Sequence, residues 1–88
     1  MFIFDFGEAL KVLRQGGRVE RKGWNGRGMY VELQRVDEHS KMTLSYLYMK
    51  TVTGDLVPWL ASQSDLLAND WHVAGQAPAA VRDFESGA

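Results

Sequence analysis

The chain of 88 residues carries a formal net charge of -1 and no cysteine, which excludes disulfides, thiolate metal sites and a cysteine nucleophile, and offers nucleic acid polymers no long-range attraction. Its 45% hydrophobic and 24% charged residues are typical of a globular protein, but a chain this short buries only roughly 60% of its unfolded surface, so association with further copies would help to stabilise it. No apolar run approaches the ~20 residues of a membrane span, and we expect a cytoplasmic protein without membrane contact.

The first predicted element is a helix over residues 5–15. Asp5 is expected to cap its N-terminus while Glu8 reaches back in a capping box, and the pair Gly16-Gly17 is expected to supply a left-handed stop. Apolar residues recur at the i, i+3, i+4, i+7 spacing of one helical face at Phe6, Ala9, Leu10 and Leu13.

Antiparallel strands are predicted next. The polar residues 37–41 and the sequence "TGD" at 53–55 are expected to form turns, and Pro58 restricts the strand that it ends to a sheet edge, because proline cannot donate to the ladder. Alternating apolar and polar residues, enriched in β-branched and aromatic types, predict strands over 18–21, 29–36, 43–52 and 56–57.

The sequence "SQSD" at 62–65 predicts the start of a short helix, and Trp71–Val73 is expected to form the last strand. The segment 75–88 has no sustained apolar period and is expected to be a flexible tail after a single domain of residues 1–74. The predicted fold is α+β: an N-terminal helix packed on a strongly bent antiparallel β-sheet, with a short second helix near residue 65.

Patterns that would indicate catalysis are mostly missing. His39 and His72 lack metal-ligand spacing, and the serines near residue 63 lack a strand-turn-helix nucleophile elbow. Asp65 could form an acid/base pair with Asp70 or His72, although an acid in the first turn of a helix is also favoured by the helix dipole. We therefore predict a protein that is not an enzyme, with no catalytic residues, metal or cofactor.

All three tryptophans, Trp24, Trp59 and Trp71, flank predicted turns instead of filling strand interiors. Indole rings stack on nucleobases, each contact contributing roughly 1–3 kcal/mol, so this placement favours a nucleotide pocket. In a domain this small, tryptophans also commonly form the core itself. Pocket and core remain open for each of the three.

The loop "KGWNGRG" at residues 22–28 strengthens the case for a pocket at Trp24. Its glycines allow backbone amides to approach a ligand closely, and Arg21, Lys22 and Arg27 offer donors for phosphate oxygens. Polar side chains that could read base edges or ribose hydroxyls are Asn25, Gln63 and Asp65. The alternative is a turn that serves only to stabilise a hairpin.

The segments "FGEALKVLRQGGRVERKGWNGRGMYV" and "YMKTVTGDLVPWLASQSDLLANDWHV" resemble a family of small phage and prophage proteins, some of which are Thoeris anti-defence proteins. The resemblance covers residues 6–73 and implies a sponge that sequesters cyclic ADP-ribose isomers made by defence TIR proteins, with some members also holding cyclic dinucleotides. It also implies a homotetramer with ligand pockets between subunits. The residues that the matching motifs contribute are Arg21, Trp24, Asn25, Trp59, Gln63, Asp65 and Trp71.

The sequence thus predicts a phage protein that binds a cyclic nucleotide signal in the infected bacterial host cell and leaves it chemically unchanged. A sponge needs a preorganised pocket and slow release, but no general base or nucleophile. The alternatives are an enzyme that cleaves the same signal and a protein-interaction module that uses exposed aromatic residues. Residues 34–43 match no motif of the family.

Overall fold

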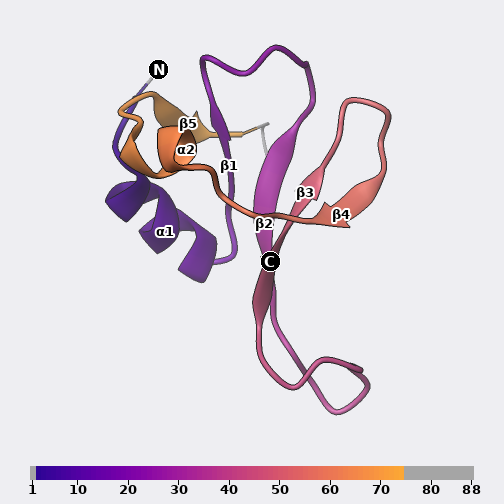
Figure 1. The fold of residues 1–88 in the computed structure, drawn as a ribbon. Coiled ribbons are helices and arrows are strands. Elements are labelled where there is room, and N and C mark those ends of the chain that lie inside the picture. The colour runs from indigo at the N-terminus through magenta and orange to yellow at the C-terminus, as the bar shows by residue number, and fades with distance from the viewer. Residues whose placement is uncertain (1, 75–88) are drawn as a thin grey trace.

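One five-stranded antiparallel sheet and two helices make up residues 2–74, the part of the chain that the computed structural model describes (Figure 1). The strand order is β4-β3-β2-β1-β5. Strands β1, β2 and β3 therefore lie inside the sheet, and β4 and β5 form its edges. This architecture confirms the predicted α+β fold. The elements are α1 (Phe6–Arg14), β1 (Arg18–Arg21), β2 (Tyr30–Gln34), β3 (Tyr46–Lys50), β4 (Leu56–Pro58), α2 (Gln63–Leu67) and β5 (Trp71–Val73).

The predicted strands over 29–36 and 43–52 are longer than the strands that form. At the end of β3, the amide of Thr51 donates to the carbonyl of Asp55 at 2.8 Å, and Gly54, at a φ of +91°, donates back to Thr51. These bonds begin the turn at Thr51, which ends the strand earlier than its β-branched residues indicate. Pro58 closes β4 at the sheet edge, as predicted.

Both ends of α1 follow from the sequence, with one correction. Asp5 caps the helix by accepting a 2.9 Å hydrogen bond from the amide of Glu8. At the other end, Gly16 has a φ of +92° and Gly17 donates to the carbonyl of Val12 at 2.9 Å, which is the left-handed stop that the two glycines predict. The reciprocal half of the capping box is wrong, because the Glu8 carboxylate instead pairs with Lys11 one turn along at 3.0 Å.

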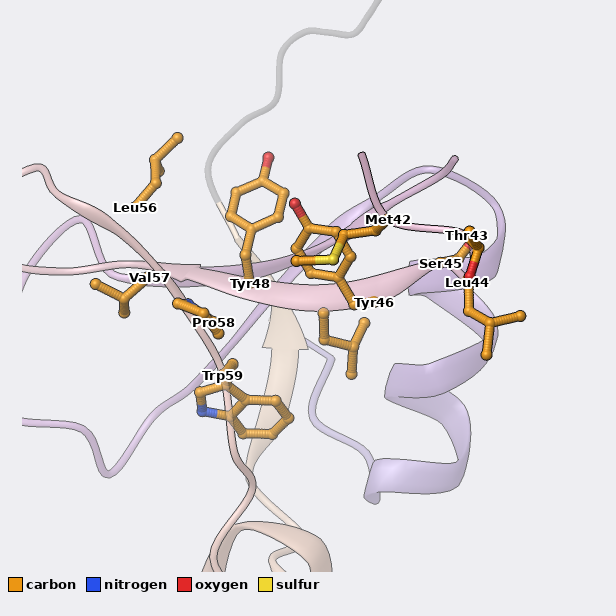
Figure 2. A pocket seen from close by; sticks show the side chains of 11 residues that line it. Met42, Thr43, Leu44, Ser45, Tyr46, Tyr48, Leu56, Val57, Pro58 and Trp59 are labelled. Carbon is orange, nitrogen blue, oxygen red and sulfur yellow. The ribbon is translucent and has the colours of Figure 1, made fainter. Parts of the chain in front are cut away.

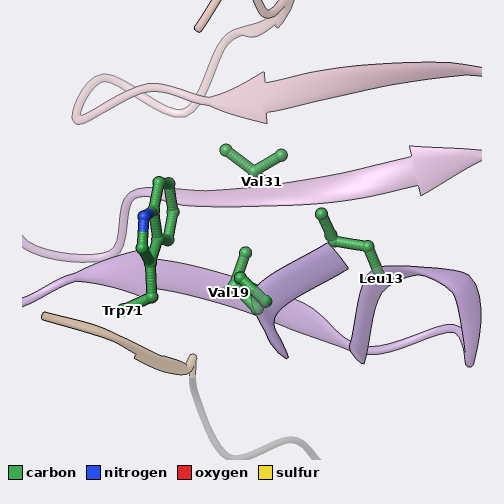
Figure 3. Packing of buried hydrophobic residues seen from close by; sticks show 5 residues of the cluster. Leu13, Val19, Val31 and Trp71 are labelled. Atoms are coloured by element: carbon green, nitrogen blue, oxygen red, sulfur yellow. The ribbon is translucent and has the colours of Figure 1, made fainter. Parts of the chain in front are cut away.

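The core lies between α1 and one face of the sheet (Figure 3). Strand register places Val19, Val31, Met49 and Val57 in one row across four strands. Helix α1 packs on β1, β2 and β5, so it covers the half of this face that contains Val19 and Val31. The fully buried residues of the core are Ala9, Leu13, Val19, Val31 and Trp71.

The opposite face of the sheet is polar and aromatic. Arg18 and Tyr48 lie on either side of Glu32, which accepts from the Arg18 Nε at 3.1 Å and from the Tyr48 hydroxyl at 2.8 Å. Burial, together with this carboxylate, raises the pKa of Tyr48 well above its ordinary value. Neither of the helices found within residues 2–74 has the length and apolar character that a membrane crossing requires.

Candidate functional site

An ionic cluster joins the end of β1 to the segment around α2. Arg21, the last residue of β1, donates from Nη1 to the Asp65 Oδ1 at 3.0 Å and from Nε to the Asp70 Oδ1 at 2.8 Å. The three side chains are only 21%, 14% and 26% exposed. Two carboxylates therefore bind one largely buried guanidinium, and the cluster fixes where the chain leaves the sheet after β1.

Asp65 takes part in this cluster because of its position in α2. Ser62 is the N-cap, and its hydroxyl accepts from the Asp65 amide at 3.1 Å while the Asp65 carboxylate accepts from the Ser62 amide at 3.3 Å. This reciprocal pair is a capping box, so the first-turn acid predicted from "SQSD" is confirmed. The cap leaves the Asp65 Oδ1 free to accept from Arg21 and from the Trp24 indole.

Each charged group in the cluster stabilises the ionised form of its oppositely charged partner. Burial alone raises the pKa of Asp65, but hydrogen bonds from Arg21, Ser62 and Trp24 outweigh it and hold that pKa below its ordinary value. The hydrogen bond from Arg21 likewise lowers the pKa of Asp70, and the two carboxylates raise the pKa of the guanidinium. All three groups are therefore ionised at neutral pH.

The loop of residues 22–28 begins at this cluster. The Gly23 amide donates to the Asp70 Oδ2 at 2.8 Å, and the Lys22 amide donates to the Asp70 backbone carbonyl at 2.9 Å. Farther along, Gly26 packs so closely that a Cβ placed there would lie 2.1 Å from a methyl group of Val52 in the β3–β4 turn. The loop is thus held at both ends.

The predicted site residues of this loop and of α2 do not all lie together. Trp24 contacts Asp65, but Asn25 is exposed in the loop and Gln63 is exposed at the first position of α2. The structure therefore assembles Arg21, Trp24 and Asp65 into one contiguous unit. It places the two amide side chains at the surface beside that unit.

An aromatic cluster of Phe6, Trp24, Trp59 and Trp71 underlies the ionic cluster. Trp71 is its centre, with ring centroids 5.3 Å from Phe6, 5.4 Å from Trp24 and 5.9 Å from Trp59. The contacts with the other two tryptophans are edge-to-face, an arrangement that aromatic quadrupoles favour. The Trp71 indole N–H donates to the backbone carbonyl of Asp65 at 2.8 Å, which ties α2 to the cluster.

For Trp71, the core alternative that the sequence leaves open is the correct one. Its side chain is fully buried, so its rings have no exposed face for a nucleobase in this structure (Figure 3). Trp24 and Trp59 are half-buried and pack against the core. Each of these two retains an accessible part, so the pocket interpretation stays a prediction for them.

A groove with a volume of about 610 Å³ lies along β3 and β4. Figure 2 shows Tyr46 and Tyr48 on one side of β3 and Trp59 on the other. Of the predicted site residues, only Trp59 lines this groove, so the groove and the ionic cluster are separate features. The lining residues are Met42 to Tyr48 and Leu56 to Trp59.

Sequence reasoning weighed Asp70 only as an acid/base partner of Asp65, and missed that it binds the loop. The sequence did contain a signal for this pairing. An arginine that is half-buried at the end of a strand requires carboxylate partners, and "SQSD" and "AND" each supply one. The groove residues 42–46 were missed because no local pattern shows which apolar residues stay uncovered. Such information comes only from the packing of distant elements.

The acid/base pairings considered from the sequence do not form a reactive site. Trp71 and His72 are adjacent in β5 and point to opposite faces, and the Trp71 indole lies beside Asp65, so His72 points away from that carboxylate. Asp65 and Asp70 are both engaged by Arg21. Within residues 2–74, no three His, Asp or Glu side chains gather closely enough to hold a metal ion.

Two comparisons place the chain among known proteins. A family model described as a Thoeris anti-defense 2-like domain matches residues 4–74. A protein of Bacillus phage SP01 named Thoeris anti-defense 2 is 35% identical over 81 aligned residues, which cover 77% of this chain and 91% of that protein. The matched range includes the ionic cluster, the loop of residues 22–28, the aromatic cluster and the groove.

Proposed function

The chain belongs to the Thoeris anti-defense 2-like family, and we propose that it binds and sequesters a cyclic nucleotide immune signal during phage infection. The ligand is a cyclic ADP-ribose isomer of the Thoeris type, and it is held in the host cell and released unchanged. An anti-defence role follows from the family. The loop of residues 22–28, held at both ends with its polar side chains exposed, is the observation that supports a binding role most directly.

The donors for ligand phosphates differ from those that the sequence suggests. Arg21 is neutralised by Asp65 and Asp70, so its charge serves the fold. Lys22 and Arg27 are exposed in the loop, and within residues 2–74 neither forms an ion pair. These two cations are the phosphate donors in our proposal, and the neighbouring Asn25 is placed to bind a base edge or a ribose hydroxyl.

Trp24 provides an aromatic surface beside these cations. Its indole is fixed by the edge-to-face contact with Trp71 and by a 3.3 Å hydrogen bond to Asp65, and its side chain is only half-buried. A ring held in one orientation loses little conformational entropy when a base stacks on its accessible part. The aromatic cluster thus supports the stacking contact that the sequence predicts.

We further propose that the ligand pocket is completed by a second copy of the chain. A ligand of this kind is buried over most of its surface in a typical pocket, whereas the exposed loop offers contact from one side only. The uncovered groove along β3 and β4 provides an apolar surface for self-association. A homotetramer, as the family resemblance implies, would bring loops and grooves of different subunits into shared sites.

Sequestration instead of cleavage fits the state of the carboxylates. A general acid or base must exchange a proton near neutral pH, but the low pKa values of Asp65 and Asp70 keep both groups ionised and bound to Arg21. These groups serve to hold the loop. The proposed function therefore requires tight binding and slow release only.

The experiment that tests this proposal is recovery of the ligand. The protein is mixed with cyclic ADP-ribose isomers and with cyclic di-GMP, excess ligand is removed, the protein is heat-denatured, and the released molecule is identified by mass spectrometry. We expect stoichiometric recovery of one unmodified cyclic ADP-ribose isomer. Recovery of a hydrolysed product would support the enzyme alternative, and recovery of cyclic di-GMP alone would change the ligand class.

The double variant Lys22→Gln, Arg27→Gln identifies the donors in the same assay. We expect it to fold normally and to retain much less ligand, because it loses two charge-assisted contacts. The matched control is Arg14→Gln with Lys41→Gln, which removes two exposed positive charges outside the loop. Equal losses in both double variants would mean that only net charge matters.

A further inference from the structure

We propose that Asp70 is a positioning residue, which holds the loop of residues 22–28 in its binding-competent conformation without touching the ligand. The proposal rests on the proposed function, since it assigns the loop a binding role. Asp70 lies outside the loop in the sequence, immediately before β5. Its effect on binding therefore has to act through the contacts that it makes with the start of the loop.

Three hydrogen bonds connect this one residue to three consecutive positions of the chain. Its Oδ1 accepts from the Arg21 Nε at 2.8 Å, its Oδ2 accepts from the Gly23 amide at 2.8 Å, and its backbone carbonyl accepts from the Lys22 amide at 2.9 Å. The side chain approaches so closely that a Cβ on Gly23 would lie 3.0 Å from Oδ2. One carboxylate oxygen thus binds the loop at Gly23, and the other binds Arg21, the strand residue that precedes the loop.

The contact between the two side chains is shielded from solvent. The Asp70 and Arg21 side chains are 26% and 21% exposed, so water competes weakly for the hydrogen bond between them, whereas the bond from the Gly23 amide is exposed. A further contact, from the Trp24 amide to the Arg21 carbonyl at 3.2 Å, continues the turn from this base. Asp70 therefore sets the direction in which the chain enters the loop, and with it the positions of Lys22 and Trp24.

A positioning role has a kinetic signature that a ligand contact does not have. When only a fraction of the molecules has an ordered loop, the apparent affinity falls by that fraction. The association rate falls in proportion, whereas the dissociation rate is unchanged, because the bound loop keeps all its ligand contacts. Removing a residue that touches the ligand mainly raises the dissociation rate.

The test is Asp70→Asn, which keeps the size of the side chain but offers one acceptor oxygen where the carboxylate has two. The control is Glu38→Gln, which removes the same charge at a position that is 83% exposed in its side chain. The first measurement is amide hydrogen exchange without ligand. We expect residues 22–28 to exchange about tenfold faster in Asp70→Asn, with a clearly smaller increase in β2 and β3, and no difference in Glu38→Gln.

The second measurement is the binding kinetics of the cyclic ADP-ribose isomer that the wild type retains. We expect about tenfold slower association with unchanged dissociation for Asp70→Asn, and partial recovery for Asp70→Glu, which restores the carboxylate. Unchanged loop exchange, or a loss confined to dissociation, would overturn the positioning role. An equal rise in exchange in residues 22–28, β2 and β3 would also overturn it, since Asp70 would then act only through the stability of the whole fold. A wild type that binds no nucleotide would refute the proposed function, while the exchange measurement would still report on the loop.

Discussion

Individual residues of similar appearance in the sequence have different roles in the fold. The three tryptophans all flank turns, yet Trp71 is fully buried and contacts the other two edge-on, whereas Trp24 and Trp59 are half-buried. The difference arises because Trp71 begins β5 on the face covered by α1, and the other two lie where the chain leaves the sheet. A substitution should therefore have a different effect at each position.

Trp71→Ala is expected to cost about 3–5 kcal/mol of unfolding free energy, because it leaves a cavity at the centre of the core. Trp24→Ala is expected to cost about 2 kcal/mol, since a half-buried ring leaves a smaller void. Urea denaturation followed by circular dichroism measures both. Equal losses would show that the burial of the two rings does not decide their contribution.

Binding measurements should distinguish a stacking role of Trp24 from a packing role. If its ring stacks on a base, Trp24→Ala lowers the affinity by about five- to 150-fold, and Trp24→Phe retains part of that contact. Titration calorimetry on folded variants gives these affinities, with melting curves taken without ligand as the control for stability. Native affinity in Trp24→Ala would assign this ring to packing alone.

The ionised carboxylates of the ionic cluster predict a dependence of stability on pH. The pKa values of Asp65 and Asp70 are depressed in the folded state, so the unfolded chain binds more protons as the pH falls. Their contribution is fully present above the unfolded pKa of about 3.9 and is lost as the pH falls through the lower folded values. We expect the urea midpoint of the wild type to decrease below about pH 4.

Asp70→Asn provides the control, because it removes one of the two groups. Its urea midpoint should be lower than that of the wild type at pH 6, and the difference should shrink as the pH decreases toward 3. A difference that stays constant over this range would show that protonation of Asp70 does not contribute.

At the scale of elements, the sequence was sufficient to predict features that depend on residues only a few positions apart. Asp5, the pair Gly16-Gly17 and "SQSD" define three helix ends, and the structure has all three. The reciprocal role of Glu8 was wrong, because Lys11 one turn later offers its carboxylate an ion pair. Strand ends were less predictable, since hydrogen bonds across the turn at Thr51 end β3 while its β-branched sequence continues.

The candidate site was predictable only in part. Arg21 and Trp24 were selected from one segment and Asp65 from another, and the structure brings Asp65 into contact with both. Their pairing with each other was not foreseen, because polar residues in a sequence look equally suited to bind a ligand or to bind one another. Asp70 was missed as a partner of the loop for the same reason.

The capping box of α2 is expected to contribute beyond the helix itself. Ser62→Ala should cost about 1 kcal/mol of unfolding free energy, which is typical for the loss of an N-cap. It should also loosen Asp65, because the Asp65 amide loses its 3.1 Å hydrogen bond to the Ser62 hydroxyl, and the carboxylate of this residue binds Arg21 at 3.0 Å. Amide exchange around Trp24 measures this second effect, with Ser64→Ala as a control in the same short helix. Equal effects of both variants would contradict a special role for the cap.

At the scale of the whole molecule, the helical layer covers only part of the sheet. Helix α1 packs on β1, β2 and β5, and the groove along β3 and β4 exposes apolar residues, among them Leu44 at 78% and Leu56 at 63%. A thin core predicts self-association in general, but the choice of face depends on where α1 packs. Figure 1 shows this asymmetry, with α1 on the side of β1 and β5 and the β3–β4 hairpin extending away from it.

Light scattering is expected to give a mass well above the 9.9 kDa of the monomer, near four times that value. Leu44→Asp should lower this mass, because burying an unpaired carboxylate in an apolar interface costs several kcal/mol. Leu67→Asp is the matched control, since Leu67 is equally exposed at 78% but lies in α2, outside the groove. A monomeric wild type at micromolar concentration would contradict pockets shared between subunits, and equal dissociation by both variants would remove the groove as the specific interface.

Leu44→Asp also tests whether the ligand site requires two subunits. It does so if this variant dissociates the assembly and abolishes ligand retention while its monomer stays folded by circular dichroism. If its monomer still retains ligand, the loop of residues 22–28 binds the signal alone, and the groove serves assembly only.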